Sequence, residues 1–137
     1  MVLAMRPAVA RWFPAASYAA LAVVSFVRPA LVPGVFGGSA PTAAARSEVR
    51  AVYAGTSLAV VRSLLAASAS TAAQHAAAVR VARDVNAAML LTRLASCVVE
   101  RRLAPWPTGA FLALETALAA ALEVEHRRCG RALPPGA

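Results

Sequence analysis

Apolar residues gather into four long stretches of the chain, and proline, glycine and charged residues separate them. These stretches cover about residues 9–27, 43–67, 72–101 and 108–125. Each is longer than an ordinary strand, and none alternates regularly between apolar and polar positions, which favours helices. Arg28-Pro29 ends the first stretch, because proline cannot continue the helical hydrogen-bond ladder. The pattern therefore predicts an all-α chain with four helices.

Short signals predict where these helices begin and end. The segment from Pro29 to Pro41 is rich in proline and glycine, so we expect a connector without regular helix. Thr71-Ala72-Ala73-Gln74 has the pattern of a capping box, which predicts the start of the third helix. Thr108 is a candidate N-cap for the fourth helix. The basic tail, residues 126–137, is expected to fray.

Composition favours a membrane protein. Of the 137 residues, 60% are hydrophobic and the mean hydropathy is +0.63, whereas about 45–50% apolar residues is usual for soluble domains. We therefore expect one domain over residues 1–137 that forms a four-helix transmembrane bundle with short loops. A cleaved signal peptide is disfavoured, because Arg28, Pro29 and Pro33 separate the first apolar stretch from the small residues Gly38-Ser39-Ala40. A soluble, basic helical domain is the alternative.

The chain has fourteen basic residues, all of them arginine, and six acidic ones, which gives a net charge of +8. The arginines are dispersed rather than clustered with aromatic residues, so no nucleic-acid partner is expected. The side that holds both termini collects Arg6, Arg11, Arg62, Arg80, Arg83, Arg127, Arg128 and Arg131, against Arg28, Arg46, Arg50, Arg101 and Arg102 on the other. This excess favours both termini in the cytoplasm and a multi-pass protein of the cytoplasmic membrane.

The second stretch carries small residues at every fourth position, which places them on one helix face. This small-residue ridge consists of Ser47, Ala51, Gly55, Ala59 and Ser63, and continues to Ala67. Small residues let helices approach closely in lipid, where hydrophobic burial no longer drives their association. The ridge is therefore expected to be the face on which a neighbouring helix packs.

Polar residues inside the predicted spans form a second pattern, which we call the polar seam. It consists of Glu48, Arg50, Arg62, Asn86, Arg93 and Glu115. An ionised side chain at the centre of a bilayer costs about 2.5–3.5 kcal/mol on insertion scales, so these residues should face the bundle interior. The seam could be a lipid, quinone or ion site, or it could hold the helices in register through structural ion pairs.

Within the seam, Arg93 and Glu115 are predicted to pair. The connection between the third and fourth helices is centred on Ala104, and the two residues lie equally far before and after it. Antiparallel neighbouring helices would thus hold them at equal depth, in the middle of the membrane. Arginine presents a fork of donors that matches a carboxylate, so the pair should be hydrogen-bonded.

The sequence contains no nucleophile–base pair, phosphate loop or metal-ligand motif, so enzymatic activity is unsupported and no cofactor is expected. Cys97 and Cys129 lack CxxC spacing and have no set of histidine ligands around them, so a metal site is not expected either. His75 is interpreted as a solitary solvated histidine.

Five features resemble a known family: Arg28-Pro-x-x-x-Pro, Phe36-Gly37, Glu48-x-Arg50-Ala51-x-Tyr53-x-Gly55, Leu91-x-Arg93-Leu94, and Glu115. Together they resemble small bacterial four-helix integral membrane proteins catalogued as a domain of unknown function. The resemblance covers nearly the whole chain and implies a multi-pass bundle without an established activity.

Two functional hypotheses follow from the sequence. The first is an accessory, scaffold or interaction subunit, with the lipid bilayer and a second copy or another membrane protein as partners. The alternative is a small dimeric transporter, or a membrane protein that binds a lipid or a quinone in the polar seam.

Overall fold

A computed structural model describes residues 7–66 and 71–132, and within these ranges the chain forms helices and no strand. The described residues contain four long helical stretches. These are α1 (Pro7–Val27), the continuous run of α3 (Ala43–Val49), η1 (Arg50–Gly55) and α4 (Thr56–Leu65), then α5 (Ala72–Val99), and α6 (Ala110–Ala132). Two short helices, α2 (Leu31–Val35) and η3 (Pro105–Gly109), lie in the connections. The prediction of an all-α chain is confirmed for this part.

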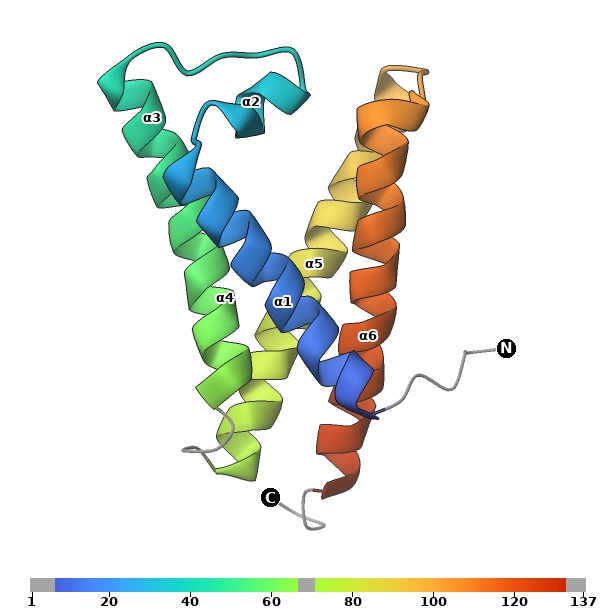
Figure 1. The fold of residues 1–137 in the computed structure, drawn as a ribbon. Coiled ribbons are helices and arrows are strands. Elements are labelled where there is room, and N and C mark those ends of the chain that lie inside the picture. The colour runs from blue at the N-terminus through green and yellow to red at the C-terminus, as the bar shows by residue number, and fades with distance from the viewer. Residues whose placement is uncertain (1–6, 67–70, 133–137) are drawn as a thin grey trace.

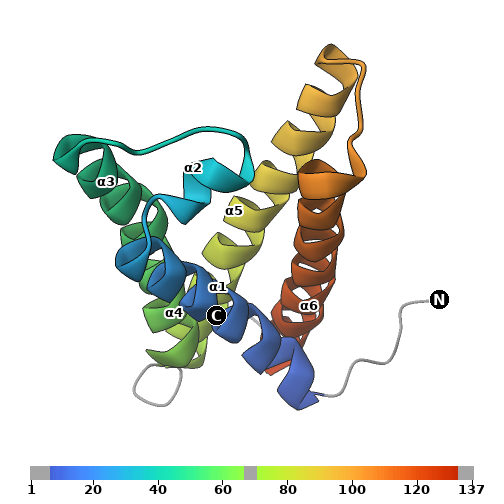
Figure 2. The same cartoon turned by 45° about the horizontal axis from the view of Figure 1, so that its top comes forward.

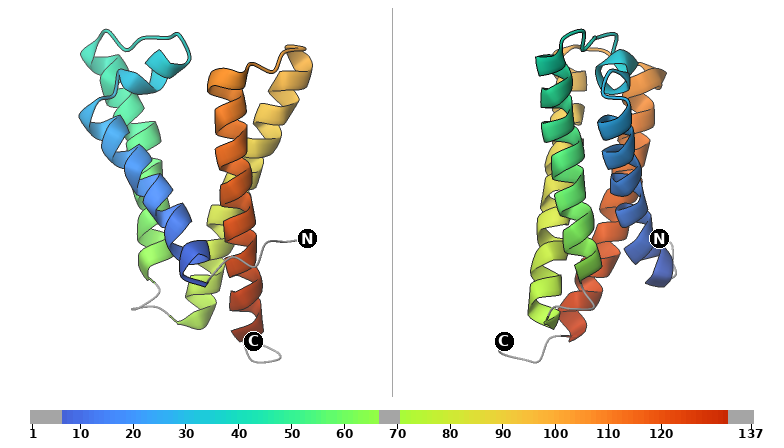
Figure 3. Two further views of the ribbon diagram at one scale, coloured as in Figure 1. Left: turned by 45° about the vertical axis from the view of Figure 1, so that its right-hand side comes forward. Right: turned by 60° about the vertical axis from the view of Figure 1, so that its left-hand side comes forward.

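The long helices form two arms that meet at one end and diverge at the other (Figure 1). One arm consists of α1 with α3, η1 and α4, and the other of α5 with α6. Contacts of α1 with α6 and of α4 with α5 join the arms. The left view of Figure 3 shows the same divergence, and the start of α1 and the end of α6 both point toward the joined end.

The core lies where the arms meet, because each long helical stretch contributes an apolar side chain there. These side chains are Ala15, Leu64, Val79, Ala82 and Leu122, all of them buried. Leu122 and Val79 are the largest apolar side chains among the fully buried residues. The short α2 lies at the opposite, divergent end, between the two arms (Figure 2).

Hydrogen bonds to threonine side chains mark the starts of two helices. The Thr42 hydroxyl accepts from the Ala45 N–H at 3.0 Å, which caps α3. At the start of α5, the Thr71 hydroxyl accepts from the Gln74 N–H at 3.2 Å, and the Gln74 side chain accepts from the Thr71 N–H at 2.9 Å. This is the reciprocal capping box that the sequence predicts.

Three predicted boundaries are wrong. Thr108 is not the N-cap of the fourth helix, because it lies inside η3, which leads directly into α6. The connector after Pro29 contains the short helix α2, which tolerates Pro33 because proline fits in the first turn, where its missing N–H has no helical partner. Helix α6 continues to Ala132, well into the tail that was expected to fray. The Glu123 carboxylate accepts from Arg127 Nε one turn later at 2.6 Å, and such pairs stabilise a helix that is otherwise rich in charge.

The second long stretch is one continuous helix with a π-helical segment, η1, in its middle. Backbone dihedral angles remain helical on both sides of η1, at Val49 and at Thr56. The Thr56 hydroxyl donates to the Val52 carbonyl one turn earlier. A π segment bonds each N–H five residues back, which lets the helix accommodate an extra residue without a break.

This helix packs through a face different from the predicted one. The five ridge residues Ser47, Ala51, Gly55, Ala59 and Ser63 are all exposed, and Ala67 lies outside the described residues. Ala54, Ser57 and Leu64 are buried instead, where η1 and α4 contact α1 and α5. The helix carries small residues on two faces, so spacing alone does not select the packed one. Within a single chain, the ridge prediction is wrong.

Two of the described helices are long and apolar enough to cross a membrane. Their spans are Val9–Val27, in α1, and Pro105–Arg131, which includes α6. Only 33% and 22% of their most apolar windows are buried inside the chain. Most of each window therefore faces outward rather than into the core.

The two faces of the second helix can be tested with neighbouring residues. We expect Ala54→Leu to destabilise the protein by about 1–3 kcal/mol, because Ala54 is 1% exposed and added methyl groups overpack the contact with α1. Gly55→Leu should leave stability within about 0.5 kcal/mol, since a Cβ there meets only the Arg50 carbonyl of its own helix at 3.9 Å. Thermal unfolding in detergent measures both. A larger loss of stability from Gly55→Leu than from Ala54→Leu would show that the small-residue ridge is a packed face.

Candidate functional site

The Arg93 and Glu115 side chains form a bidentate ion pair between α5 and α6. Arg93 Nε donates to Glu115 Oε2 at 3.0 Å, and Arg93 Nη2 donates to Glu115 Oε1 at 2.7 Å. The Glu115 side chain is only 4% exposed and that of Arg93 is 23% exposed. The predicted pairing is confirmed, with the fork geometry that gives charge-assisted hydrogen bonds their strength.

Neighbouring side chains fix this pair from two directions. The Asn86 amide, fully buried two turns before Arg93, donates from Nδ2 to the Glu115 carbonyl at 2.9 Å. The Arg93 guanidinium carbon lies 5.2 Å from the centre of the Phe111 ring, within cation–π range. The Phe111 ring in turn stacks on Phe36 with centroids 5.3 Å apart, which ties the end of α2 to α6.

A cavity of about 340 Å³, the central cavity, lies beside the ion pair. Side chains of α1, α2, η1, α5 and α6 line it, and most of them are apolar. Its polar side chains are Ser17, Tyr18, Tyr53, Asn86, Arg93 and Glu115. An apolar hollow with a few polar groups is the usual form of a small-molecule site.

Two polar atoms of the central cavity have no hydrogen-bond partner. The Tyr18 hydroxyl belongs to a side chain that is 6% exposed, and Asn86 Oδ1 belongs to one that is fully buried. Leaving a buried polar atom unpaired costs about 1–3 kcal/mol, so such atoms usually have a partner or a function. Both residues line the cavity, so its wall contains a donor at Tyr18 and an acceptor at Asn86 that have no partner.

A second, more open hollow of about 750 Å³ adjoins the central cavity along α5. The two share Phe36, Met89 and Arg93 as lining residues. The second hollow extends along α5 to Ser96 and Glu100. Arg93 therefore lies between a mostly apolar cavity and a more open, more polar one.

The structure brings together only half of the predicted polar seam. Asn86, Arg93 and Glu115 lie at the central cavity, whereas Glu48 is exposed on α3. Arg50 turns to α1, where its Nε donates to the Phe26 carbonyl at 3.0 Å. Arg62 lines a separate hollow of about 410 Å³ between α4 and α5. The arms diverge toward α3, so its charged residues lie away from α5 and α6 (Figure 1).

Tyr18 is the functional candidate that the sequence analysis missed. A single tyrosine in an apolar stretch has no partner pattern, so periodicity does not distinguish it. It lies on the same face as the small residues Ala15, Ala22 and Ser25, all buried. A lone hydroxyl-bearing ring on a face of small residues is the signal that could have drawn attention to it.

A cluster at the joined end contradicts two further expectations. His75, expected to be solitary, has its Nε2 3.6 Å from Glu125 Oε1. Cys129, expected to lack a set of metal ligands, lies with both of them. The antiparallel packing of α5 and α6 brings together residues that are distant in sequence.

A scan of the chain against protein-family models, a search of curated proteins and a search of solved structures each found no match. The resemblance carried by Glu48–Gly55 and the other motifs therefore stays a prediction. The geometry of the central cavity is the observation from which function must be argued.

The ion pair can be tested by removing one partner and then both. Glu115→Ala leaves a guanidinium without its carboxylate, and we expect a loss of about 3–5 kcal/mol. The double change Arg93→Met with Glu115→Leu should restore much of that stability, because it removes both charges and keeps the volume filled. Thermal unfolding in detergent measures each variant.

Glu123→Ala is the control, because Glu123 is half-buried on the same helix, where it pairs with the exposed Arg127 and lies 3.5 Å from Arg83 of α5. Surface pairs contribute about 0–1 kcal/mol. If Glu115→Ala lowered the stability no more than this control does, the buried pair would stabilise the fold no more than a surface pair. A double variant less stable than Glu115→Ala would contradict the charge argument.

Proposed function

We propose that this chain is a four-helix integral membrane protein that binds a small amphiphilic molecule in its central cavity. The ligand class is a mostly apolar molecule with a carbonyl or hydroxyl group, as in quinones and lipids. The observation that carries the proposal is the pair of buried, unpaired polar atoms, Tyr18 Oη and Asn86 Oδ1, on residues that line a mostly apolar cavity.

The outward surface supports the membrane placement. Large apolar side chains point away from the chain along the second half of α5: Leu91 is 65% exposed, Val98 76% and Val99 77%. Contiguous apolar surface of this kind marks a membrane or a partner interface. The helices α1 and α6 add two candidate spans whose apolar windows also face mostly outward.

The cavity chemistry supports the ligand class. A ligand carbonyl would accept from the Tyr18 hydroxyl, and a ligand hydroxyl would donate to Asn86 Oδ1. The remaining wall, formed by side chains such as Leu21, Val35 and Leu118, would enclose an apolar body. A volume of about 340 Å³ falls at the lower end of small-molecule sites, so it suits a headgroup or a short apolar molecule.

The alternative of a small dimeric transporter, driven by protons, is the weaker proposal. Proton coupling would require Glu115 to take up and release a proton. Its side chain, however, is only 4% exposed, and its carboxylate accepts hydrogen bonds from Arg93 Nε and Nη2. Protonation would leave the guanidinium without its countercharge in a buried place, which is costly. An accessory or interaction subunit, with a second copy or another membrane protein as partner, is compatible with ligand binding and stays a prediction.

Ligand binding can be tested with two probes, a short-tailed benzoquinone and a monoacylglycerol, titrated calorimetrically into the purified protein in detergent. Tyr18→Phe should weaken binding of the accepted probe by about 3- to 10-fold, the value of one hydrogen bond. Ser17→Phe should abolish it by filling the cavity, while Ala16→Phe, at the adjacent exposed position, should not. No binding of either probe, or equal effects of the two phenylalanine variants, would overturn the proposal.

Membrane topology makes a separate prediction. With both termini in the cytoplasm, a reporter enzyme fused after Ala137 should be active on the cytoplasmic side, and one inserted at Gly38 on the outer side. The protein should also resist carbonate extraction from membranes. Release by carbonate would exclude the bilayer placement, and reversed reporter activities would show that the arginine count gives the wrong orientation.

A further inference from the structure

The joined end of the arms brings three metal-ligating side chains together from two helices. His75 lies in the first turn of α5, and Glu125 and Cys129 lie one turn apart on the facing side of α6. Their potential ligand atoms, a ring nitrogen, a carboxylate oxygen and the thiol sulfur, all lie within 4.8 Å of one another. The cluster shares no residue with the lining of the central cavity.

These groups are withdrawn from solvent. The side chains of His75 and Glu125 are 16% and 14% exposed. Cys129 packs against the hydrophobic core cluster. His75 Nδ1 is buried without a hydrogen-bond partner, and Nε2 lies 3.6 Å from Glu125 Oε1, beyond normal hydrogen-bond distance. The imidazole is thus largely buried beside the Glu125 carboxylate, although no direct hydrogen bond explains its position.

We propose that His75, Glu125 and Cys129 bind one Zn²⁺ ion. Hard cations such as Ca²⁺ and Mg²⁺ take oxygen ligands, whereas a set of thiolate, imidazole and carboxylate suits zinc. Zinc ligands at about 2.0–2.3 Å from the metal lie about 3.3–3.8 Å apart in a tetrahedron, so the cluster needs to contract by about 1 Å. Three protein ligands leave a fourth position for water or another donor.

Charge around the site is compatible with a cation. Arg128 Nη1 lies 3.8 Å from Glu125 Oε2, on the carboxylate oxygen that does not face His75. This contact leaves Oε1 toward the metal position and helps to orient the carboxylate, as outer partners of metal ligands do. The positive charge of Arg128 opposes the metal, but the thiolate and the carboxylate together supply two negative charges.

A bound ion would tie the first turn of α5 to the last turns of α6. The core side chains Val79 and Leu122 lie one turn inward on the same two helices. The site therefore acts as a cross-link at the closed end of the two arms. This inference does not depend on the ligand in the central cavity, so either can fail without the other.

The test is zinc titration of the full-length protein in detergent at neutral pH, with any affinity tag removed. We expect one Zn²⁺ per chain. His75→Ala and Cys129→Ser should each weaken binding by about 100-fold or more, since even outer-shell changes cost about 10–100-fold. The chain supplies matched controls in its other histidine and its other cysteine: His126→Ala and Cys97→Ser should bind zinc as the unchanged protein does.

Two measurements on the unchanged protein keep the test decisive if a variant fails to fold. Co²⁺ should produce a thiolate-to-metal charge-transfer band in the near ultraviolet. Zinc should protect Cys129, but not Cys97, from alkylation, as read by peptide mass spectrometry. Stoichiometric zinc binding with selective protection of Cys129 supports the site. Absence of zinc binding, or equal protection of both cysteines, would falsify it.

Discussion

The buried ion pair between Arg93 and Glu115 is the interaction on which the arrangement of α5 and α6 depends. Each charge would be costly alone in an apolar interior, so the two helices are constrained to the register that brings them together. Asn86 reinforces that register, because it bonds to the backbone of the same glutamate. Buried polar contacts of this kind contribute less to net stability than to the choice of one arrangement over its neighbours, and a shift by one turn would separate all three groups.

The position of the central cavity follows from this constraint and from the divergence of the arms. Below the ion pair, the two arms meet through small and aliphatic core residues such as Ala82 and Leu122. Above it, α1 and α5 separate (Figure 1), and α2 lies over the opening with Phe36 stacked on Phe111. The ion pair and the Phe36–Phe111 stack are therefore parts of the cavity wall. Its shape results from packing that is tight at one end and open at the other.

The sequence predicts those features that depend on local chemistry or on the position of a residue along a helix axis. Proline and the capping box at Thr71 locate helix ends, because their effects act within one turn. The ion pair could be predicted because a short connection between antiparallel helices fixes depth, and a buried charge requires a partner. The position of a residue along the helix axis does not determine the direction in which its side of the helix faces. The small-residue ridge prediction fails for this reason.

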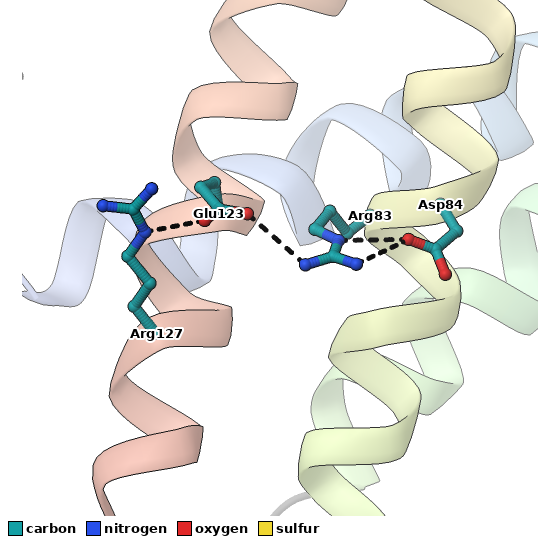
Figure 4. Close-up of polar contacts among 4 residues, drawn as sticks. All are labelled: Arg83, Asp84, Glu123 and Arg127. Carbon is teal, nitrogen blue, oxygen red and sulfur yellow. Dashed lines mark hydrogen bonds and ion pairs between the residues drawn. The ribbon is translucent and has the colours of Figure 1, made fainter.

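The length of α6 and the cluster at the joined end were missed for a related reason. Charged residues in the last turns of α6 were interpreted as solvated tail, although they pair with one another and with α5. Figure 4 shows this network: Arg83 of α5 binds Asp84 and reaches Glu123 at 3.5 Å, and Glu123 also pairs with Arg127. His75 and Cys129 meet only because α5 and α6 are antiparallel, a relation that sequence spacing does not express.

The same network marks a boundary that bears on the proposed membrane placement. On α5, no exposed residue from Val85 to Val99 carries a charge, and on α6 none does from Ala110 to Leu122. At 1.5 Å per residue these surfaces are about 22 Å and 20 Å long, shorter than the usual hydrocarbon thickness of about 30 Å. Arg93 lies nine residues after Asp84 and seven before Glu100, so the ion pair falls near the middle of this uncharged surface. A bundle with so short an apolar surface must thin the bilayer around it or extend its arginines toward the headgroups. The proposed membrane placement is thus consistent with a buried charge pair at the centre of the bundle, where local thinning reduces the cost of keeping it there.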